Sequence, residues 1–294
     1  KSIYEVPLLL HKQNMGRLVN ERLELNKKPN LSKLKNFVHN YKNPKSEVTI
    51  AMCGKYTELI DSYKSVLESF VHAGVENSAR VNIKWVKTDK IIDDSSAQRA
   101  FNNVDGVLIL PGFGSRGSEG KILSSKYARE NNIPFLGICL GMQCAIIDFA
   151  RHVCGLSGAN STEFNKRTKY PVVDLMESQK AIKIKGGTMR LGAYNCSIKT
   201  GTKTFAAYRS KKISERHRHR YEVNNRYKKR LEKAGMVISG VNDDLGVVET
   251  IEISDHPWFV AGQFHPELKS RVNKAHPLFR DFIKASKKYN KKRS

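Results

Sequence analysis

The seven residues Gly-Ile-Cys-Leu-Gly-Met-Gln at 137–143 constrain the fold of this chain more than any other stretch. The short apolar run 133–136 before them predicts a buried strand, and apolar residues at helical spacing follow from Met142 to Val153. Cys139 therefore lies where a strand turns sharply into a helix, and a glycine on either side allows a tight turn. This arrangement is typical of a nucleophile elbow, with cysteine in place of serine.

The elbow predicts that Cys139 is a catalytic thiol. It presents the sulfur to a cleft, and the N-terminus of the following helix favours the thiolate. A free cysteine is more often a buried structural residue, so this interpretation requires a base elsewhere in the chain. Cys144 is expected about 140° further around the helix, at about 100° per residue, and so outside the cleft.

The sequence His265-Pro266-Glu267 offers the base that a cysteine nucleophile needs. It follows the apolar run 258–264, which predicts a late strand. On extended backbone the side chains of His265 and Glu267 can point the same way, so that the carboxylate fixes the tautomer of the imidazole. From these residues alone, a surface histidine without a catalytic role remains an alternative.

Two backbone N–H groups are candidates for an oxyanion hole, which a tetrahedral intermediate requires. One belongs to Leu140, directly after the nucleophile, and the other to Gly112, in a glycine turn after the predicted strand 104–110. In parallel α/β sheets, ligands bind at the carboxyl ends of the strands, where both turns and His265 are expected to lie.

The order of the elements before residue 155 predicts an α/β fold. Strands alternate with helices through short connections, which favours a doubly wound, mostly parallel sheet with helices on both faces. The expected strands are 48–52, 81–86, 104–110 and 133–136, and the expected helices include one from about residue 59 to a stop at Gly74 and one ending at 127–131.

Past residue 155 the pattern predicts a small subregion of strands and loops. Residues 157–170 are polar and loop-like, and residues 181–192 predict a loop or hairpin. The run 216–223 alternates, so that as a strand it places three arginines on one face and two histidines on the other. Apolar residues at 278–283 predict a closing helix before a basic tail at 286–294.

The net charge of +24 is unusual. Such a charge is typical of proteins that bind nucleic acids or other anions. Much of it is segmental, since residues 1–45 carry ten Lys and Arg against three Glu, and residues 284–294 carry six basic residues and no acidic one. No nucleic-acid-binding motif is present, so we favour a solvated Lys-rich surface and keep a basic nucleic-acid-binding module as the alternative.

The cysteines and the apolar runs indicate the cellular compartment in which the protein is expected. Five cysteines without a Cys-x-x-Cys pair fit neither a disulfide framework nor a zinc site, so we expect no metal site and a reducing compartment. No apolar run is long enough to cross a membrane, and no signal peptide is visible. We therefore expect a cytoplasmic protein without a membrane partner, and a chain that is a piece of a longer one.

Residues 137–143, taken with Gln-Phe-His-Pro-Glu at 263–267, resemble the class I glutamine amidotransferases, which have a flavodoxin-like α/β fold. Further motifs resemble one branch of this family, in which the glutaminase is joined to a synthase that aminates UTP. These motifs lie at 114–120, 160–164, 186–192 and 215–224. On this resemblance, residues 1–45 are the end of the synthase domain and a linker, and residues 46–285 are the amidotransferase domain.

The resemblance implies that Cys139, His265 and Glu267 form a triad that hydrolyses L-glutamine to glutamate and ammonia through a thioester. It implies that Glu163 binds the α-amino group of the substrate and Arg220 its α-carboxylate. Phe113, Gln143 and Tyr221 are implied as further substrate-binding residues. Where the family usually has a first glycine, this chain has Pro111, which lacks an N–H group, while the oxyanion donor Gly112 is kept.

The resemblance also implies cofactors and partners. No cofactor is implied for this domain, whereas ATP, UTP, Mg and GTP are implied for the full-length enzyme, a homotetramer containing the synthase domain. GTP would act as an allosteric activator near the loop 186–192, where Arg190 and Leu191 are the candidate regulatory residues and Arg190 could meet a phosphate or an acidic partner surface. A different γ-glutamyl hydrolase with the same triad remains a second alternative.

Overall fold

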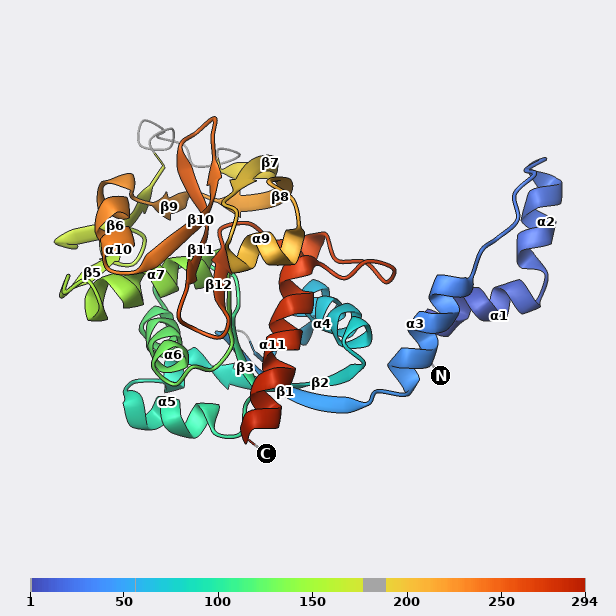
Figure 1. Ribbon diagram of the computed structural model, residues 1–294, viewed down its shortest axis with the longest axis horizontal. Coiled ribbons are helices and arrows are strands. Elements are labelled where there is room, and N and C mark those ends of the chain that lie inside the picture. The colour runs from blue at the N-terminus through green and yellow to red at the C-terminus, as the bar shows by residue number, and fades with distance from the viewer. Residues whose placement is uncertain (1, 56, 177–188, 294) are drawn as a thin grey trace.

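The computed structural model describes residues 2–55, 57–176 and 189–293. Its centre is a nine-stranded sheet with the order β2-β1-β3-β4-β12-β11-β10-β7-β8 (Figure 1). The strands, in this order, are Ala79–Lys87, Ser46–Gly54, Gly106–Ile109, Phe135–Ile138, Phe259–Gly262, Val247–Ile253, Met236–Asn242, Arg190–Ile198 and Lys212–His219.

The sheet has a parallel half and an antiparallel half. The strands from β2 to β12 in this order pair in parallel, and the strands from β12 to β8 pair antiparallel. β3, β4 and β12 are buried along their whole length because helices cover both faces of the parallel half. The predicted parallel α/β architecture is confirmed, and the antiparallel half completes it.

Helices lie on both faces of the sheet (Figure 1). Because side chains alternate along a strand, Ala51 and Cys53 of β1 belong to one hydrophobic core and Ile50 and Met52 to the other. One core contains side chains from α5, α6 and α7, and the other from α4 and α11. These helices are Asp94–Phe101, Ser118–Glu130, Leu140–His152, Lys64–Glu76 and Pro277–Arg293.

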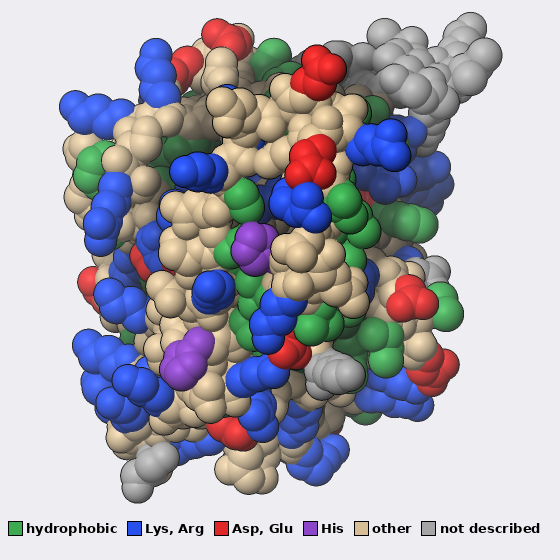
Figure 2. Space-filling view, turned by 90° about the vertical axis from the view of Figure 1, so that its right-hand side faces the viewer, with side chains coloured by type: hydrophobic (Ala, Val, Ile, Leu, Met, Phe, Trp, Pro, Cys, Tyr) green, Lys and Arg blue, Asp and Glu red, His purple; other side chains and the backbone are tan. Residues whose placement is uncertain are grey.

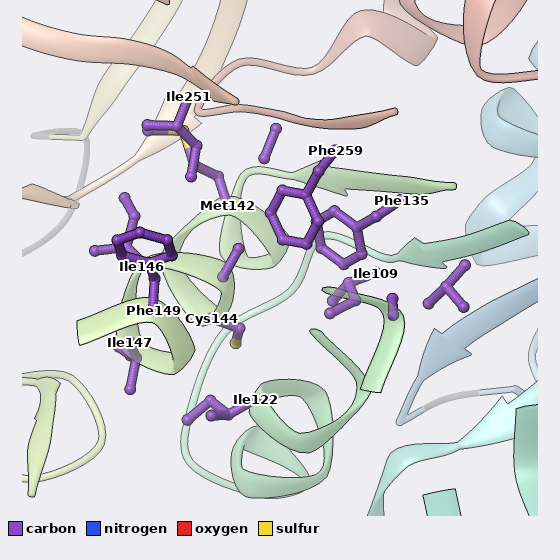
Figure 3. Packing of buried hydrophobic residues seen from close by; sticks show 14 of the residues in the cluster. Ile109, Ile122, Phe135, Met142, Cys144, Ile146, Ile147, Phe149, Ile251 and Phe259 are labelled. Atoms are coloured by element: carbon purple, nitrogen blue, oxygen red, sulfur yellow. The ribbon is translucent and has the colours of Figure 1, made fainter. Parts of the chain in front are cut away.

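The first core packs around β4, β12 and α7. Phe135 of β4 and Phe259 of β12 stack with their ring centroids 4.2 Å apart (Figure 3). Met142 and Cys144 of α7 pack in the same cluster, and Cys144 is fully buried. The prediction that Cys144 points away from the cleft is confirmed.

A second, three-stranded sheet forms the predicted small subregion. It consists of β5 (Ala159–Ser161), β6 (Tyr170–Leu175) and β9 (Tyr221–Val223), so that part of the expected loop 157–170 is strand. Short helices α9 (Lys203–Tyr208) and α10 (Lys228–Lys233) pack against β10 of the large sheet.

Two further expectations past residue 155 have different outcomes. Of the loop or hairpin expected at 181–192, residues 181–188 lie outside the described residues, and β7 begins at Arg190. The alternation expected at 216–223 is confirmed over β8. There Arg216 and Arg218 are exposed, while His217 and His219 are buried.

Both ends of the described part of the chain are helical. The first described residues form η1 (Ile3–Glu5), α1 (Val6–Lys12) and α2 (Met15–Arg22), and α1 and α2 stand away from the sheet (Figure 1). They are followed by α3 (Ser32–Lys42), whose Phe37 packs with Tyr4 and Val75. The tail expected at 286–294 is wrong, because α11 runs to Arg293.

Charged side chains are spread widely over one face of the molecule (Figure 2). On the face drawn in Figure 2, Lys and Arg occur over the whole face, with Asp, Glu and small hydrophobic groups between them. Among the residues that the structure describes, no helix is both long enough and apolar enough to span a membrane.

Gly120 allows α6 to approach the short helix η3 (Thr88–Lys90), and we expect Gly120→Ala to destabilise the fold. A Cβ atom at Gly120 would lie 1.7 Å from the carbonyl oxygen of Thr88. Backbone must therefore move, at a cost of about 3 kcal/mol in the free energy of unfolding. Urea unfolding measures this cost. The matched control is Gly16→Ala in α2, where nothing lies within 4 Å; equal stability of the two variants would contradict the prediction.

Candidate active site

The candidate nucleophile Cys139 joins β4 to α7 in a strained backbone conformation. Its φ is 52° and its ψ is −102°, which is rare for a residue with a side chain. Its N–H donates to the carbonyl oxygen of Gly262 at 2.8 Å, so that the pairing of β4 with β12 continues to this residue. Strain of this kind costs on the order of 1–3 kcal/mol and persists only where the surrounding structure holds it.

The two glycines of the elbow provide space for close packing. A Cβ at Gly141 would lie 2.5 Å from the carbonyl oxygen of Ile109, and one at Gly137 would lie 2.9 Å from the carbonyl carbon of Gly141. Neither glycine has a positive φ; the unusual dihedral belongs to Cys139 itself. The elbow is confirmed, and the glycines are required because α7 begins in contact with β3 and β4.

His265 and Glu267 form a buried pair beside this elbow. Nδ1 of His265 lies 2.7 Å from Oε1 of Glu267, and the two side chains are 12% and 7% exposed. The backbone turns into the short helix η5 (Pro266–Leu268) here, and the N–H of His265 donates to the carbonyl oxygen of Arg216 at 2.7 Å. The expected contact between the two side chains is therefore present, on turning rather than extended backbone.

The other edge of the His265 ring is available for proton transfer. Nε2 is buried and makes no hydrogen bond with any residue that the structure describes. Burial alone would lower the pKa of His265, but its interactions with Cys139 and Glu267 outweigh burial and raise it to about 10. The ring is thus an imidazolium at neutral pH, and it lines the same cavity as Cys139.

One cavity of about 760 Å³ brings the predicted site residues together. Cys139, His265 and Glu267 line it, although Cys139 and His265 come from strand ends far apart in the sequence. The other predicted site residues that line it are Gly112, Phe113, Gln143, Glu163, Arg220 and Tyr221. Other residues that line it, among them Lys55, Tyr63 and Met189, were not predicted from the sequence.

The two candidate oxyanion donors are neighbours in space. A Cβ at Gly112 would lie 3.5 Å from Cδ2 of Leu140 and 3.4 Å from Nζ of Lys121. Leu140 is the first residue of α7, where a backbone N–H has no acceptor within the helix. Lys121 is buried, which lowers its pKa, and it donates to the carbonyl oxygen of Leu110 at 3.0 Å, so its side chain supports the turn that carries Gly112.

Charges of opposite sign face the cavity near Glu163. Oε1 of Glu163 accepts from the N–H of Gly114 at 2.8 Å. Burial raises the pKa of Glu163, against the opposing effects of the Gly114 N–H and of Lys55, Lys121 and Arg220. Nζ of Lys55 donates to the carbonyl oxygen of Phe113 at 2.6 Å and lies 4.6 Å from the centre of its ring. Such a site can hold a zwitterion.

Two contacts of this site were not predicted from the sequence, one made by the side chain of Gln263 and one by that of Lys121. Gln263 Nε2 donates to the Cys139 sulfur at 3.6 Å, and its Oε1 accepts from Gln143 Nε2 at 3.2 Å. Lys121 supports the Gly112 turn from within α6. Neither contact follows from local sequence, because each depends on how separate elements pack.

The expectation for Arg190 is contradicted. Its guanidinium is buried, its Nη2 pairs with Oε1 of Glu249 at 2.5 Å, and it lies 4.2 Å from the centre of the Tyr194 ring. It is therefore not placed to meet a phosphate or a partner surface in this structure. Leu191 is 64% exposed, and residues 186–188 of the expected regulatory loop lie outside the described residues.

Comparison with known proteins identifies the relatives of this chain. Residues 58–285 match the family Glutamine amidotransferase class-I. The chain is 54% identical to CTP synthase from Chlorobaculum tepidum over 292 residues and 55% identical to that from Chlorobium phaeobacteroides over 294. These alignments cover 98% and 99% of this chain but 52% of each relative, so the chain spans about half the length of these curated relatives.

A solved structure gives a similar result. The Trypanosoma brucei CTPS glutaminase domain with bound acivicin is 39% identical to this chain and has a TM-score of 0.77. The match covers 82% of this chain and 94% of that one.

Proposed function

The chain belongs to the class I glutamine amidotransferases, and we propose that it hydrolyses L-glutamine to glutamate and ammonia with Cys139 as the nucleophile. The observation that carries the proposal is the cavity in which Cys139 faces the buried His265–Glu267 pair. An imidazolium beside a cysteine is the arrangement that maintains a reactive thiolate at neutral pH.

The first half of the reaction forms a thioester. The Cys139 thiolate attacks the side-chain amide carbon of glutamine, and the N–H groups of Leu140 and Gly112 stabilise the oxyanion that develops. His265 gives its proton to the departing nitrogen, so that ammonia leaves and a glutamyl thioester remains. Glu267 holds the ring in the tautomer and orientation that this transfer requires.

The second half restores the enzyme. His265, now neutral, removes a proton from a water molecule, which attacks the thioester carbon. The same two N–H groups stabilise the second oxyanion. Its collapse releases glutamate and returns Cys139 to the thiolate and His265 to the imidazolium.

We expect Glu163→Gln and Arg220→Met to raise KM for glutamine by about 10- to 100-fold each, with smaller effects on kcat. Each would remove one charge-assisted interaction with the zwitterionic substrate, worth about 1.5–3 kcal/mol. Steady-state ammonia release measures KM and kcat separately. The exposed residues Glu232 and Arg226 offer the control variants Glu232→Gln and Arg226→Met. A fall in kcat with an unchanged KM would contradict these binding roles.

The ammonia would be used by a second domain. The curated relatives of about twice this length are CTP synthases, so the proposed acceptor is UTP, aminated to CTP with ATP and Mg in a synthase domain of the same enzyme. We also propose that GTP activates the glutaminase from the junction with that domain and that the full-length enzyme is a homotetramer. An isolated glutaminase with full activity would waste glutamine, so low basal activity is expected.

Covalent labelling tests the proposed function even if turnover is slow. The chain is incubated with a glutamine-mimicking electrophile, and the modified residue is mapped by mass spectrometry alongside an assay of ammonia release. Modification of Cys139 that glutamine prevents supports the proposal, and the absence of both labelling and ammonia release overturns it. Release of glutamate from glutamyl conjugates without dependence on Glu163 or Arg220 would favour another γ-glutamyl hydrolase.

A further inference from the structure

We infer that Gln263 is a further catalytic residue, because its side-chain amide donates a hydrogen bond to the Cys139 sulfur and favours the thiolate over the thiol. The inference rests on the proposed function of Cys139. It also assigns a role to a buried series of hydrogen bonds that ends at this amide. Gln143 Nε2 donates to the backbone carbonyl of Tyr221 and to Oε1 of Gln263, and Gln263 Nε2 donates to the sulfur.

The register of two parallel strands places Gln263 beside the nucleophile. Gly262 of β12 pairs with Ile138 of β4. The residues that follow them, Gln263 and Cys139, therefore lie side by side. The N–H of Gln263 donates to the carbonyl oxygen of Glu249 at 2.8 Å, which fixes its backbone from the other side. Gln263 is fully buried and Cys139 is 5% exposed, so water competes little for the contact.

The orientation of the Gln263 amide follows from hydrogen bonding. A carbonyl oxygen can only accept, so the Gln143 atom that lies 2.9 Å from the carbonyl oxygen of Tyr221 must be the nitrogen. The same Gln143 nitrogen donates its second hydrogen to a side-chain atom of Gln263 that lies 3.2 Å away. That atom has to accept, so it is the amide oxygen of Gln263. The nitrogen of Gln263 is therefore the atom that faces Sγ, at 3.6 Å.

The Tyr221 carbonyl is itself held in place by a second donor. Nδ1 of His219 lies 3.0 Å from it and must carry the proton, because the carbonyl cannot donate. An oxygen with two lone pairs can accept from both His219 and Gln143. The hydrogen bonds made by His219, Tyr221 and Gln143 are thus all consistent with one orientation of the Gln263 amide.

This orientation has a chemical consequence for the sulfur. An N–H group cannot accept the thiol proton, and a hydrogen bond to a charged acceptor is stronger than one to a neutral acceptor. The contact therefore stabilises the ionised form of Cys139 more than the neutral form. The imidazolium of His265 has the same effect through its charge, whereas Gln263 contributes without a charge of its own.

The pH dependence of Cys139 alkylation by iodoacetamide tests this role directly. This reaction reports the thiolate and does not require glutamine to bind. In Gln263→Met, which keeps the length of the side chain but has no donor, we expect the midpoint of the rate profile to rise by about one pH unit, which is about a tenfold loss of rate at pH values below the midpoint. Ammonia release measured at such a pH should lose about tenfold in kcat with little change in KM.

The controls separate the amide from other charges near the sulfur. His265, Glu163 and Lys121 lie close to Cys139 and are unchanged in the variants, so a shift reports the amide. The matched control is Gln98→Met on the exposed side of α5, which should behave as the unmodified chain. If Gln263→Met does not fold, Gln263→Glu preserves the volume, and its carboxylate should raise the midpoint further.

Failure of the inference about Gln263 can be distinguished from failure of the proposed glutaminase function. If Gln263→Met or Gln263→Glu is folded and has the alkylation profile of the unmodified chain, the inference is wrong even though Cys139 is the nucleophile. If the unmodified chain neither releases ammonia nor reacts with the glutamine-mimicking electrophile, the proposed function fails first. A shifted profile with reduced kcat and unchanged KM supports the inference.

Discussion

Replacing Cys139 with alanine should abolish ammonia release from glutamine, lowering kcat by about 10⁴-fold or more, because no other group in the cavity can form the thioester. The fold should be retained, since alanine keeps the Cβ atom and removes only a sulfur that lines the cavity. Ammonia release and the free energy of unfolding, measured on the same preparation, separate loss of chemistry from loss of structure.

The chain offers a matched control for this variant five residues further along the same helix. Cys144 is fully buried in the core, and burial raises the pKa of its thiol to about 12. Cys144→Ala should therefore cost some stability but leave kcat within a few-fold of the unmodified chain. Turnover that survives Cys139→Ala, or is lost in Cys144→Ala without unfolding, would contradict the assignment of the nucleophile.

Replacing His265 with asparagine should be nearly as damaging, with kcat within about tenfold of that of Cys139→Ala, because members of a catalytic unit are not additive. The variant removes both the imidazolium beside the thiolate and the proton donor for the leaving nitrogen. The measurement is kcat for ammonia release together with the rate of Cys139 alkylation at neutral pH, and both should fall. His39→Asn, on the exposed side of α3, is the control.

Glu267→Gln should be at least about tenfold less severe, because Glu267 orients the base and does not react. The carboxylate helps to raise the pKa of His265 to about 10, so removing its charge lowers that pKa. The imidazolium is then lost at a lower pH, and the alkaline limit of kcat/KM should move downward from near pH 10. A Glu267 variant worse than the His265 variant would contradict these roles.

The core of the candidate site could be predicted because its parts are encoded locally. The elbow needs only a strand, two glycines and a helix in sequence, and all of these surround Cys139 within a few residues. The base and its carboxylate are two positions apart, so their contact at 2.7 Å required no knowledge of the fold. The family resemblance then located Glu163 and Arg220 on the same cavity.

Contacts between distant segments could not be predicted in this way. Gln263 reaches the sulfur because β12 pairs with β4 in one particular register, and no local pattern indicates that register. Arg190 looked like a loop residue after two glycines, but it begins a strand that is stabilised by pairing with β8, and its charge is neutralised by Glu249 from β11.

The ends of helices were the least predictable part of the fold. Gly74 was expected to end α4, but the helix continues to Glu76. The glycine instead provides room for the carbonyl oxygen of Ala79, which would lie 2.6 Å from a Cβ. The basic C-terminal residues are helical rather than a tail. Arg293 donates to the carbonyl oxygen of Val104 at 2.9 Å and pairs with Asp105 at 3.0 Å, which holds the last turn of α11 to the body.

The position of β12 in the sheet has a consequence for how the chain acquires activity during synthesis. This strand lies between β4 and β11, in the middle of the sheet, yet it is the last strand to leave the ribosome. A nascent chain interrupted before residue 259 would contain the thiol of Cys139 but neither its base nor the amide of Gln263, and β4 would have an unpaired edge. Closing such a sequence-distant pairing is intrinsically slow. The nucleophile is thus made early and activated only when nearly the whole domain has been translated, so incomplete chains would not consume glutamine.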